Sequence, residues 1–284
     1  MKTIKLIAIA LLLSIGAVSC SSDEDPHQIE KDPMTGFNLL TGINANGHTV
    51  ELYSQGDHFI TGYNEIYIRI KDNADDSYFP DVEITWLPVM KMIGMAHSCP
   101  RSTVMLTDHH TISKGFIIFQ MAGTEEEYWE LSLNYRVGGQ EYSSTTKIAV
   151  KMPADQKQRI TAFMGDDGVR YVLAMVSPQE PKVGVNDMQA LLYRMENAMV
   201  FSGVRNYKIT LDPRMPGMGN HGSPNNTDLS YDADSGSYNG KLNLSMTGYW
   251  KLNLKLMNGT GEVLKGEDVT EEREASSLFF ELEF

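Results

Sequence analysis

The stretch Val82-Glu-Ile-Thr-Trp-Leu-Pro-Val-Met90 decides the fold, because it returns in altered form as Tyr207-Lys-Ile-Thr-Leu-Asp-Pro-Arg-Met215. Both stretches keep Ile-Thr, Pro and Met in the same places. Val82 and Ile84 alternate with polar residues in the first stretch, and a period of two with β-branched and aromatic residues is typical of half-buried strands. The sequence therefore predicts a β-structure that is present twice.

Further landmarks recur in the same order, with an offset between the two copies that stays between 121 and 125 residues. We interpret the chain as two tandem copies, 36–152 and 157–284, joined by a short polar segment with one proline. The matching pairs are Gly62 and Gly184, Asn64 and Asn186, Met90 and Met215, His97 and His221, Met121 and Met246, and Trp129 and Trp250.

Several short strands in each copy favour an all-β fold made of two immunoglobulin-like β-sandwich domains. One segment allows another interpretation, since Leu191, Leu192, Met195 and Met199 lie at helical spacing within Met188–Met199. The repeat aligns this segment with the predicted strand 65–70 of the first copy. We therefore expect a strand there.

The first residues predict export. Residues 1–19 contain two lysines followed by an apolar stretch that is too short to span a membrane, and they end with Ala17-Val-Ser19 directly before Cys20. This ending resembles the lipobox of bacterial lipoproteins, which implies cleavage before Cys20 and a lipid on its sulfur. A plain secretory signal is the alternative. The acidic tether, residues 20–35, resembles those that send lipoproteins of the Bacteroides group to the cell surface. We expect an outer-membrane lipoprotein that is periplasmic or surface-exposed.

The charge and hydropathy of the chain limit the kinds of partner that we expect. The net charge is -13, and removal of the two signal lysines makes the mature chain more acidic still. No basic patch is left to neutralise a phosphate backbone, so nucleic acid is excluded as an expected partner. No stretch after the signal is long and apolar enough to cross a bilayer, so the membrane contact would be the lipid on Cys20.

The second copy contains an unusual loop, Pro213-Arg-Met215-Pro-Gly-Met218-Gly-Asn-His221-Gly-Ser-Pro224. Methionine usually fills cores and rarely collects in a loop rich in proline and glycine. Thioethers with an imidazole suit Cu(I), and also Ag(I), better than any hard cation. We predict that Met215, Met218 and His221 bind copper, with Met246 as a fourth candidate ligand. The alternative is that these methionines pack into one end of the sandwich.

The first copy contains a variant of this loop, with Met90, Met92, Met95, His97 and Cys99. With Cys20 lipidated, Cys99 is left without a partner for a disulfide, so it is either buried or bound to metal. Alternation predicts that Met95, His97 and Cys99 share one face of a strand. We include Met90 and Met121 in this second candidate metal site. A buried strand edge is the alternative.

Two other groups of polar residues are better interpreted as ordinary turns than as metal sites. The adjacent His109 and His110 would point in different directions in an extended chain, so a solvated turn is the better interpretation. Asp232-Ala-Asp-Ser-Gly236 is similar to the start of a calcium loop but lacks its closing glutamate, which favours an acidic hairpin turn.

The second copy resembles the YtkA-like/FixH-like domain over most of residues 170–260. The residues that carry this resemblance are Pro213, Met215, Met218, His221, Pro224, Met246 and Trp250. The first copy resembles it less, because it lacks the Met-Pro-Gly-Met core. The resemblance implies a small extracytoplasmic β-sandwich, of a kind often found beside copper export or oxidase assembly.

The sequence contains no Gly-x-Ser-x-Gly, His-Glu-x-x-His or phosphate-binding glycine loop, and we expect no enzymatic activity. The first functional hypothesis is a lipid-anchored Cu(I) buffer or chaperone that passes metal to a transporter or oxidase. The alternative is a surface interaction or structural module that binds no metal.

Overall fold

The computed structural model describes residues 31–284. The predicted signal peptide, Cys20 and most of the tether lie outside the described residues. The chain divides into two units, one ending at Thr35 and one running from Gly36 to Phe284. In the described part of the first unit, the backbone N–H of Met34 donates to Asp32 Oδ1 at 2.9 Å, and that of Thr35 donates to the Asp32 carbonyl.

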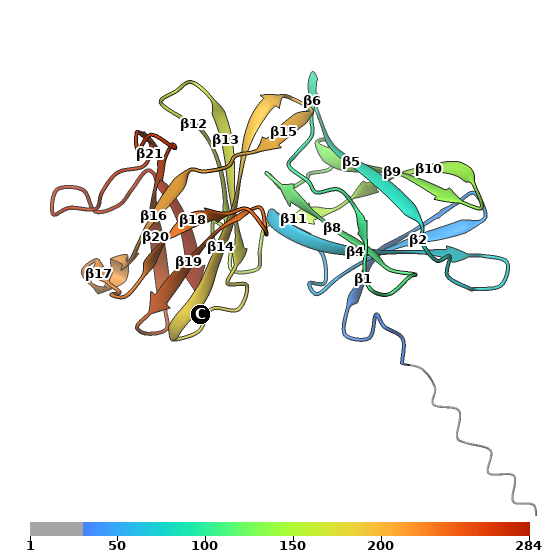
Figure 1. The fold of residues 1–284 in the computed structure, drawn as a ribbon, viewed down its shortest axis with the longest axis horizontal. Helices are drawn as coiled ribbons and strands as arrows, with labels where there is room; N and C mark the ends of the chain where they lie inside the picture. The colour runs from blue at the N-terminus through green and yellow to red at the C-terminus, as the bar shows by residue number, and fades with distance from the viewer. Residues whose placement is uncertain (1–30) are drawn as a thin grey trace, which may run out of the picture. The chain divides into compact units, whose positions relative to one another are not determined.

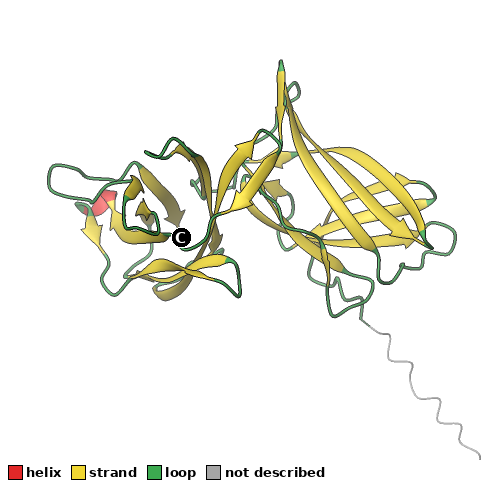
Figure 2. Ribbon diagram, turned by 45° about the horizontal axis from the view of Figure 1, so that its top comes forward, coloured by secondary structure: helices red, strands yellow, loops and turns green. Residues whose placement is uncertain are grey.

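The second unit is all-β, as predicted, and its described residues contain one 3-10 turn and no α-helix (Figure 2). No helix among the described residues has the length and apolar character needed to cross a membrane.

The first half of this unit contains three sheets, with strand orders β1-β2-β4-β8-β7, β10-β9-β5-β6 and β11-β3. Its strands are β1 (Asn38–Ala45), β2 (His48–Ser54), β3 (Phe59–Ile60), β4 (Gly62–Asp72), β5 (Glu83–Met92), β6 (Met95–His97), β7 (Met105–Leu106), β8 (Ser113–Phe119), β9 (Tyr128–Val137), β10 (Gln140–Ile148) and β11 (Val150–Lys151).

The second half forms one larger sheet whose main path is β12-β13-β14-β19-β18-β16-β20-β21 (Figure 1). Its elements are β12 (Ile160–Met164), β13 (Arg170–Ser177), β14 (Gly184–Asn197), β15 (Val200–Gly203), β16 (Lys208–Met215), the 3-10 turn η1 (Pro216–Met218), β17 (His221–Gly222), β18 (Thr227–Asp232), β19 (Ser237–Leu244), β20 (Tyr249–Met257), β21 (Val263–Lys265) and β22 (Leu278–Glu283).

The strands follow the alternation predicted from the sequence. In β4, Ile66, Ile68 and Ile70 are buried, and in β20 Trp250, Leu252 and Leu254 are buried. The segment Met188–Met199 is not helical, because β14 runs through most of it and pairs with β13 and β19. Burial in β14 follows a period of two up to Ala190, and Leu191 on the other face is buried as well because it packs in the small cluster with Ile118.

Each half has its own core, which is the physical basis of the tandem sandwich fold. One cluster draws on residues 43–150 and contains the fully buried Trp129, and the other draws on residues 163–282 and contains the fully buried Trp250. A smaller apolar cluster contains Ile118 of the first half with Val172, Ala174 and Leu191 of the second. Residues 36–284 therefore form one compact unit, and the domain boundary at 152–157 stays a prediction.

The repeat is also visible in strand pairing. Pro88 of β5 is opposite Leu131 of β9, and Pro213 of β16 is opposite Leu252 of β20. These are the positions that the sequence repeat aligns. The shared Pro-x-Met stretch therefore occupies the same place in the same strand pair in both halves.

The two predicted turns are confirmed. His109 and His110 are exposed between β7 and β8, and His110 Nδ1 lies 2.9 Å from Asp81 Oδ1. The acidic segment from Asp232 to Gly236 connects β18 to β19, and Ser235 Oγ donates to Asp232 Oδ2 at 2.8 Å.

Candidate metal site

The second-copy site is built on a pair of residues that lie opposite each other. Strand β16 ends at Met215, and the short strand β17 begins at His221. These two residues are antiparallel partners, as are Arg214 and Gly222. Residues opposite each other on antiparallel strands have Cβ atoms about 5 Å apart. The fold therefore brings Met215 and His221 together, although five residues separate them.

The loop between Met215 and His221 contains backbone conformations that favour glycine. Pro216–Met218 forms η1, and Gly219 and Asn220 follow with φ angles of 63° and 57°. Proline is suited to the first position of such a turn, and glycine and asparagine tolerate the left-handed region. The Asn220 amide then donates to the Glu274 carbonyl at 2.9 Å, which fixes the loop against a distant segment.

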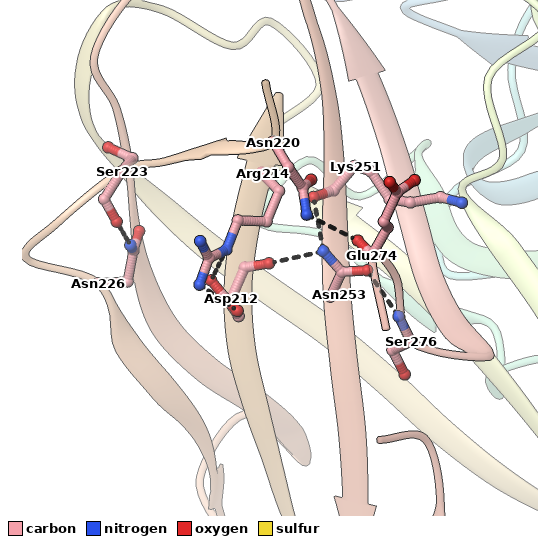
Figure 3. Close-up of polar contacts among 9 residues, drawn as sticks. All are labelled: Asp212, Arg214, Asn220, Ser223, Asn226, Lys251, Asn253, Glu274 and Ser276. Atoms are coloured by element: carbon pink, nitrogen blue, oxygen red, sulfur yellow. Dashed lines mark hydrogen bonds and ion pairs between the residues drawn. The ribbon is translucent and has the colours of Figure 1, made fainter. Parts of the chain in front are cut away.

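A polar network beneath the loop holds β16 in place (Figure 3). Arg214 Nε and Nη2 donate to the two carboxylate oxygens of Asp212 at 2.8 and 3.0 Å, a bidentate geometry. The guanidinium packs against Gly222, where an added Cβ would lie 3.3 Å from it. Asn253 is buried and joins two segments, because it donates to the Asp212 carbonyl and accepts from the Ser276 N–H.

The four predicted ligands differ in exposure. Met215 is buried, with 4% of its surface accessible, whereas Met218 is 58% and Met246 38% exposed, and His221 is also exposed. The Met215 side chain reaches the loop that contains Met246, because an added Cβ on Gly248 would lie 3.0 Å from Met215 Cε. One thioether of the set therefore belongs to the core and two belong to the surface.

Met246 does not lie on a strand, contrary to the expectation from the alternation of Leu242, Leu244 and Met246. Strand β19 ends at Leu244, and Met246 follows in the connection to β20. Trp250 Nε1 donates to the Met246 carbonyl at 3.0 Å, so the indole is bonded to the backbone of this connection. The alternation continued past the strand end because the sequence contains no proline or glycine there until Gly248.

The first copy repeats this arrangement. Met90 of β5 and His97 of β6 are antiparallel partners, like Met215 and His221. Trp129 Nε1 donates to the Met121 carbonyl at 2.9 Å, as Trp250 does to Met246. Met90 is buried and Met121 packs against the core. The three residues Met90, His97 and Met121 therefore stand where Met215, His221 and Met246 stand.

His97 has a defined orientation. Its Nδ1 lies 2.8 Å from the Ser98 carbonyl, and its ring is edge-on to Trp129 at a centroid distance of 5.6 Å. An Nδ1–H that donates to a carbonyl leaves Nε2 as the neutral ring's acceptor atom. His97 would therefore bind a metal through Nε2.

Met95, His97 and Cys99 do not share one face, because β6 ends at His97 and the chain then turns inward. Met95 is 58% exposed, whereas Cys99 is buried in the core of the first half. Burial raises the pKa of the Cys99 thiol well above its usual range, and the nearby Arg101 opposes this only in part. A metal would have to displace that proton inside the core.

Among the described residues, no group of three or more His, Cys, Asp and Glu side chains is placed to hold a metal ion. The Met/His sites are of another kind, because most of their donors are thioethers. Sequence reasoning missed the polar supports of the second site. The Asp212-x-Arg214 spacing on a strand was the available signal, since it places both side chains on one face.

No family model matches the chain, and no curated protein matches it in sequence. Some solved structures are similar. FdeC, an Escherichia coli adhesin, matches with 13% identity over 80% of this chain and 65% of that chain, at a TM-score of 0.24. A DUF4785 family protein from Legionella pneumophila matches with 10% identity over 77% of this chain and 54% of that chain, at 0.25.

A conserved domain protein from Bacillus anthracis matches with 10% identity over 87% of this chain and 86% of that chain, at a TM-score of 0.28. The chain thus spans less than two thirds of the first two proteins. None of these similarities is close enough to carry an argument about function.

Proposed function

We propose that this protein is a lipid-anchored, extracytoplasmic Cu(I)-binding protein whose main site is formed by Met215, Met218 and His221, with Met246 beside them. The observation that supports this proposal is the repeated pairing of a strand methionine with a histidine on the neighbouring strand. Core packing alone requires an apolar residue at the positions of Met90 and Met215. It does not require an imidazole at the positions of His97 and His221.

The exposure of the ligands supports the same proposal. Met218 and Met246 place large apolar side chains in water, which forgoes the free energy that burial of a methionine provides. A soft metal ion bound to their sulfur atoms would cover them. Thioethers and a neutral imidazole need not lose a proton to bind, so such a site would load at neutral pH without base catalysis.

The role that fits these ligands is a buffer or chaperone. Cu(I) accepts low coordination numbers, so partner thiolates can replace thioethers one at a time while the metal stays bound. The partner would be a copper transporter or an oxidase in the same envelope. The first copy, with Met90, His97 and Met121, would be a second and more enclosed site, to which Met95 and Cys99 would contribute only after rearrangement.

The test is native mass spectrometry and a competition titration with Cu(I) under reducing conditions. Met215→Leu/Met218→Leu removes two sulfur atoms and keeps volume and apolarity, so the fold should lose less than about 1.5 kcal/mol per site while Cu(I) affinity collapses. The control is Met188→Leu/Met164→Leu, which changes one buried and one exposed methionine elsewhere in the same half.

If the Met215/Met218 variant binds Cu(I) as tightly as the parent, the loop is structural. The protein is then an interaction module of the alternative class. The variant Met90→Leu/His97→Gln, measured in the same way, decides whether the first copy binds metal.

A further inference from the structure

The methionines of the two candidate metal sites differ in their access to solvent. In the second copy, the exposed thioethers are those of Met218 and Met246, while Met215 is buried. In the first copy, Met90 is fully buried and Met121 is only partly exposed. A small oxidant in solution therefore reaches two thioethers of the second site directly, whereas the strand methionine of each site is shielded.

The chain around the two exposed thioethers leaves them open to approach. Met218 is the last residue of η1 and lies between Gly217 and Gly219. An added Cβ at either glycine would meet nothing within 4 Å. Both chain neighbours of Met246 are exposed as well. Neither thioether needs a local opening of the fold to react.

Oxidation of a surface thioether changes its chemistry without burying a polar group. A peroxide transfers one oxygen atom to the sulfur, so the O–O bond breaks, the sulfur loses two electrons and the peroxide is reduced to water. The product is a sulfoxide, which is polar and disrupts apolar cores. Met218 and Met246 are already in water, so the sulfoxide is tolerated there. At Met215, whose Cε packs against Gly248, it would place an oxygen in the core.

The new donor no longer suits a soft metal. Thioether sulfur is a soft ligand of the kind that Cu(I) prefers, whereas an oxygen donor suits harder cations. Two oxidations would leave only Met215 and His221 of the four candidate ligands. We propose, building on the proposed function, that peroxides reversibly oxidise Met218 and Met246 to sulfoxides and so release Cu(I) from the second copy, while Met90 of the first copy stays reduced.

Metal binding and oxidation compete for the same electron pairs. A sulfur atom that donates a lone pair to a metal has less electron density to give to a peroxide. Bound metal should therefore protect Met218 and Met246 but not exposed methionines elsewhere. Met105 and Met164 are 66% and 54% exposed and belong to neither site, so they provide an internal comparison.

The first experiment uses Ag(I), which suits the same donors as Cu(I) and is not itself oxidised by dilute peroxide. The full chain, metal-free or loaded with Ag(I) in chloride-free buffer, is treated with hydrogen peroxide, and peptide mass spectrometry measures the oxygen gained by each methionine. In the metal-free protein, these four exposed methionines should be oxidised, whereas Met90 and Met215 should not. Ag(I) should slow the oxidation of Met218 and Met246 only.

The second experiment measures release from the second copy alone, in the Met90→Leu/His97→Gln variant. After removal of the peroxide, the Cu(I) affinity of the oxidised protein should be at least about tenfold weaker, since even the partners of metal ligands are worth that much. The two methionine sulfoxide reductases, one for each sulfoxide epimer, should restore it. The urea midpoint should not change on oxidation.

The matched control adds Met105→Leu/Met164→Leu to the same protein. It removes the exposed methionines outside the sites, and peroxide should weaken its Cu(I) binding as before. Untreated parent that binds no Cu(I) contradicts the proposed function, and this inference with it. Where untreated protein binds Cu(I), three results overturn the inference alone: Ag(I) protection that does not distinguish the four exposed methionines, Met215 oxidised as fast as Met218, or Cu(I) affinity that is unchanged once Met218 and Met246 are both oxidised.

Discussion

Asn64 and Asn186 make the same hydrogen bonds at the same place in the two halves. Asn64 Oδ1 accepts from the Ile60 N–H at 2.9 Å, and its amide donates to the Ile60 carbonyl at 2.7 Å. Asn186 does the same with Lys182, at 3.0 and 2.8 Å. Both side chains are buried at the start of a long strand, so each closes the turn that leads into its sandwich.

Replacing Asn186 or Asn64 by alanine should lower the free energy of unfolding by about 1–3 kcal/mol each, because the backbone N–H and C=O groups of the turn lose their side-chain partner. Urea unfolding measures this. Asn38→Ala is the control, since Asn38 is exposed and makes a single bond to the Gln55 carbonyl. Its cost should stay within about 0.5 kcal/mol. Equal costs at all three positions would contradict the assigned role.

Gly248→Ala should both destabilise the second half and disturb its metal site. Gly248 has a φ of 123°, which L-residues rarely adopt, and the new methyl would press on Met215 Cε. Gly261→Ala is the matched control, because its φ is 87° and an added Cβ meets nothing within 4 Å. Both variants should lose about 1–3 kcal/mol through backbone strain. A copper titration should show weaker binding only for Gly248→Ala.

Cys99 should be inert in the folded protein and should make stability depend on pH. Its pKa is raised by burial, so the folded state holds the proton after the unfolded state has lost it. The thiol's contribution is therefore complete below about pH 8.5 and falls by about 1.4 kcal/mol by about pH 9.5. Urea unfolding at pH 7 and 9.5 should show this loss in the parent and not in Cys99→Ala. Rapid alkylation of the native protein by iodoacetamide would contradict burial.

Cys20→Ala should leave the protein unprocessed or soluble, because the lipid attachment site predicted from the sequence is removed. Fractionation of the expressing bacterium with metabolic labelling by a fatty acid measures this. Cys99→Ala serves as the control and should still be labelled. A Cys20→Ala protein that remains processed and membrane-bound would exclude lipid anchoring at this residue.

The sequence predicted the all-β fold because the repeat allowed the local patterns of the two copies to be compared with each other. The helical spacing of Leu191, Leu192, Met195 and Met199 would have misled a reading of that segment alone. Its alignment with the β4 segment identified it correctly as a strand, since duplicated sequences keep the same hydrogen-bonding partners. The alternation of Ile66, Ile68 and Ile70 in the first copy showed the period of two, which is less regular in the second copy.

Details of the candidate site were less predictable. Sequence spacing placed Met95, His97 and Cys99 on one face, but a strand ends where its pairing ends, and β6 pairs only with the last three residues of β5. The sequence also could not show that Met215 is buried while Met218 is exposed. Burial is decided by tertiary contacts, such as the contact of Met215 with Gly248. The pairing of Met215 with His221 depends on the register of β16 and β17, which the spacing of the residues did not predict.

The indole bonds of Trp129 and Trp250 have a practical consequence. Each indole is hydrogen-bonded to the carbonyl of a methionine that belongs to one candidate site, and Trp86 is the only other tryptophan. Indole emission responds to the hydrogen bond of its N–H and to nearby soft metals. With Trp86 replaced by phenylalanine, the chain carries one intrinsic fluorescent reporter per half. Occupancy of the two copies can then be followed separately in unlabelled protein.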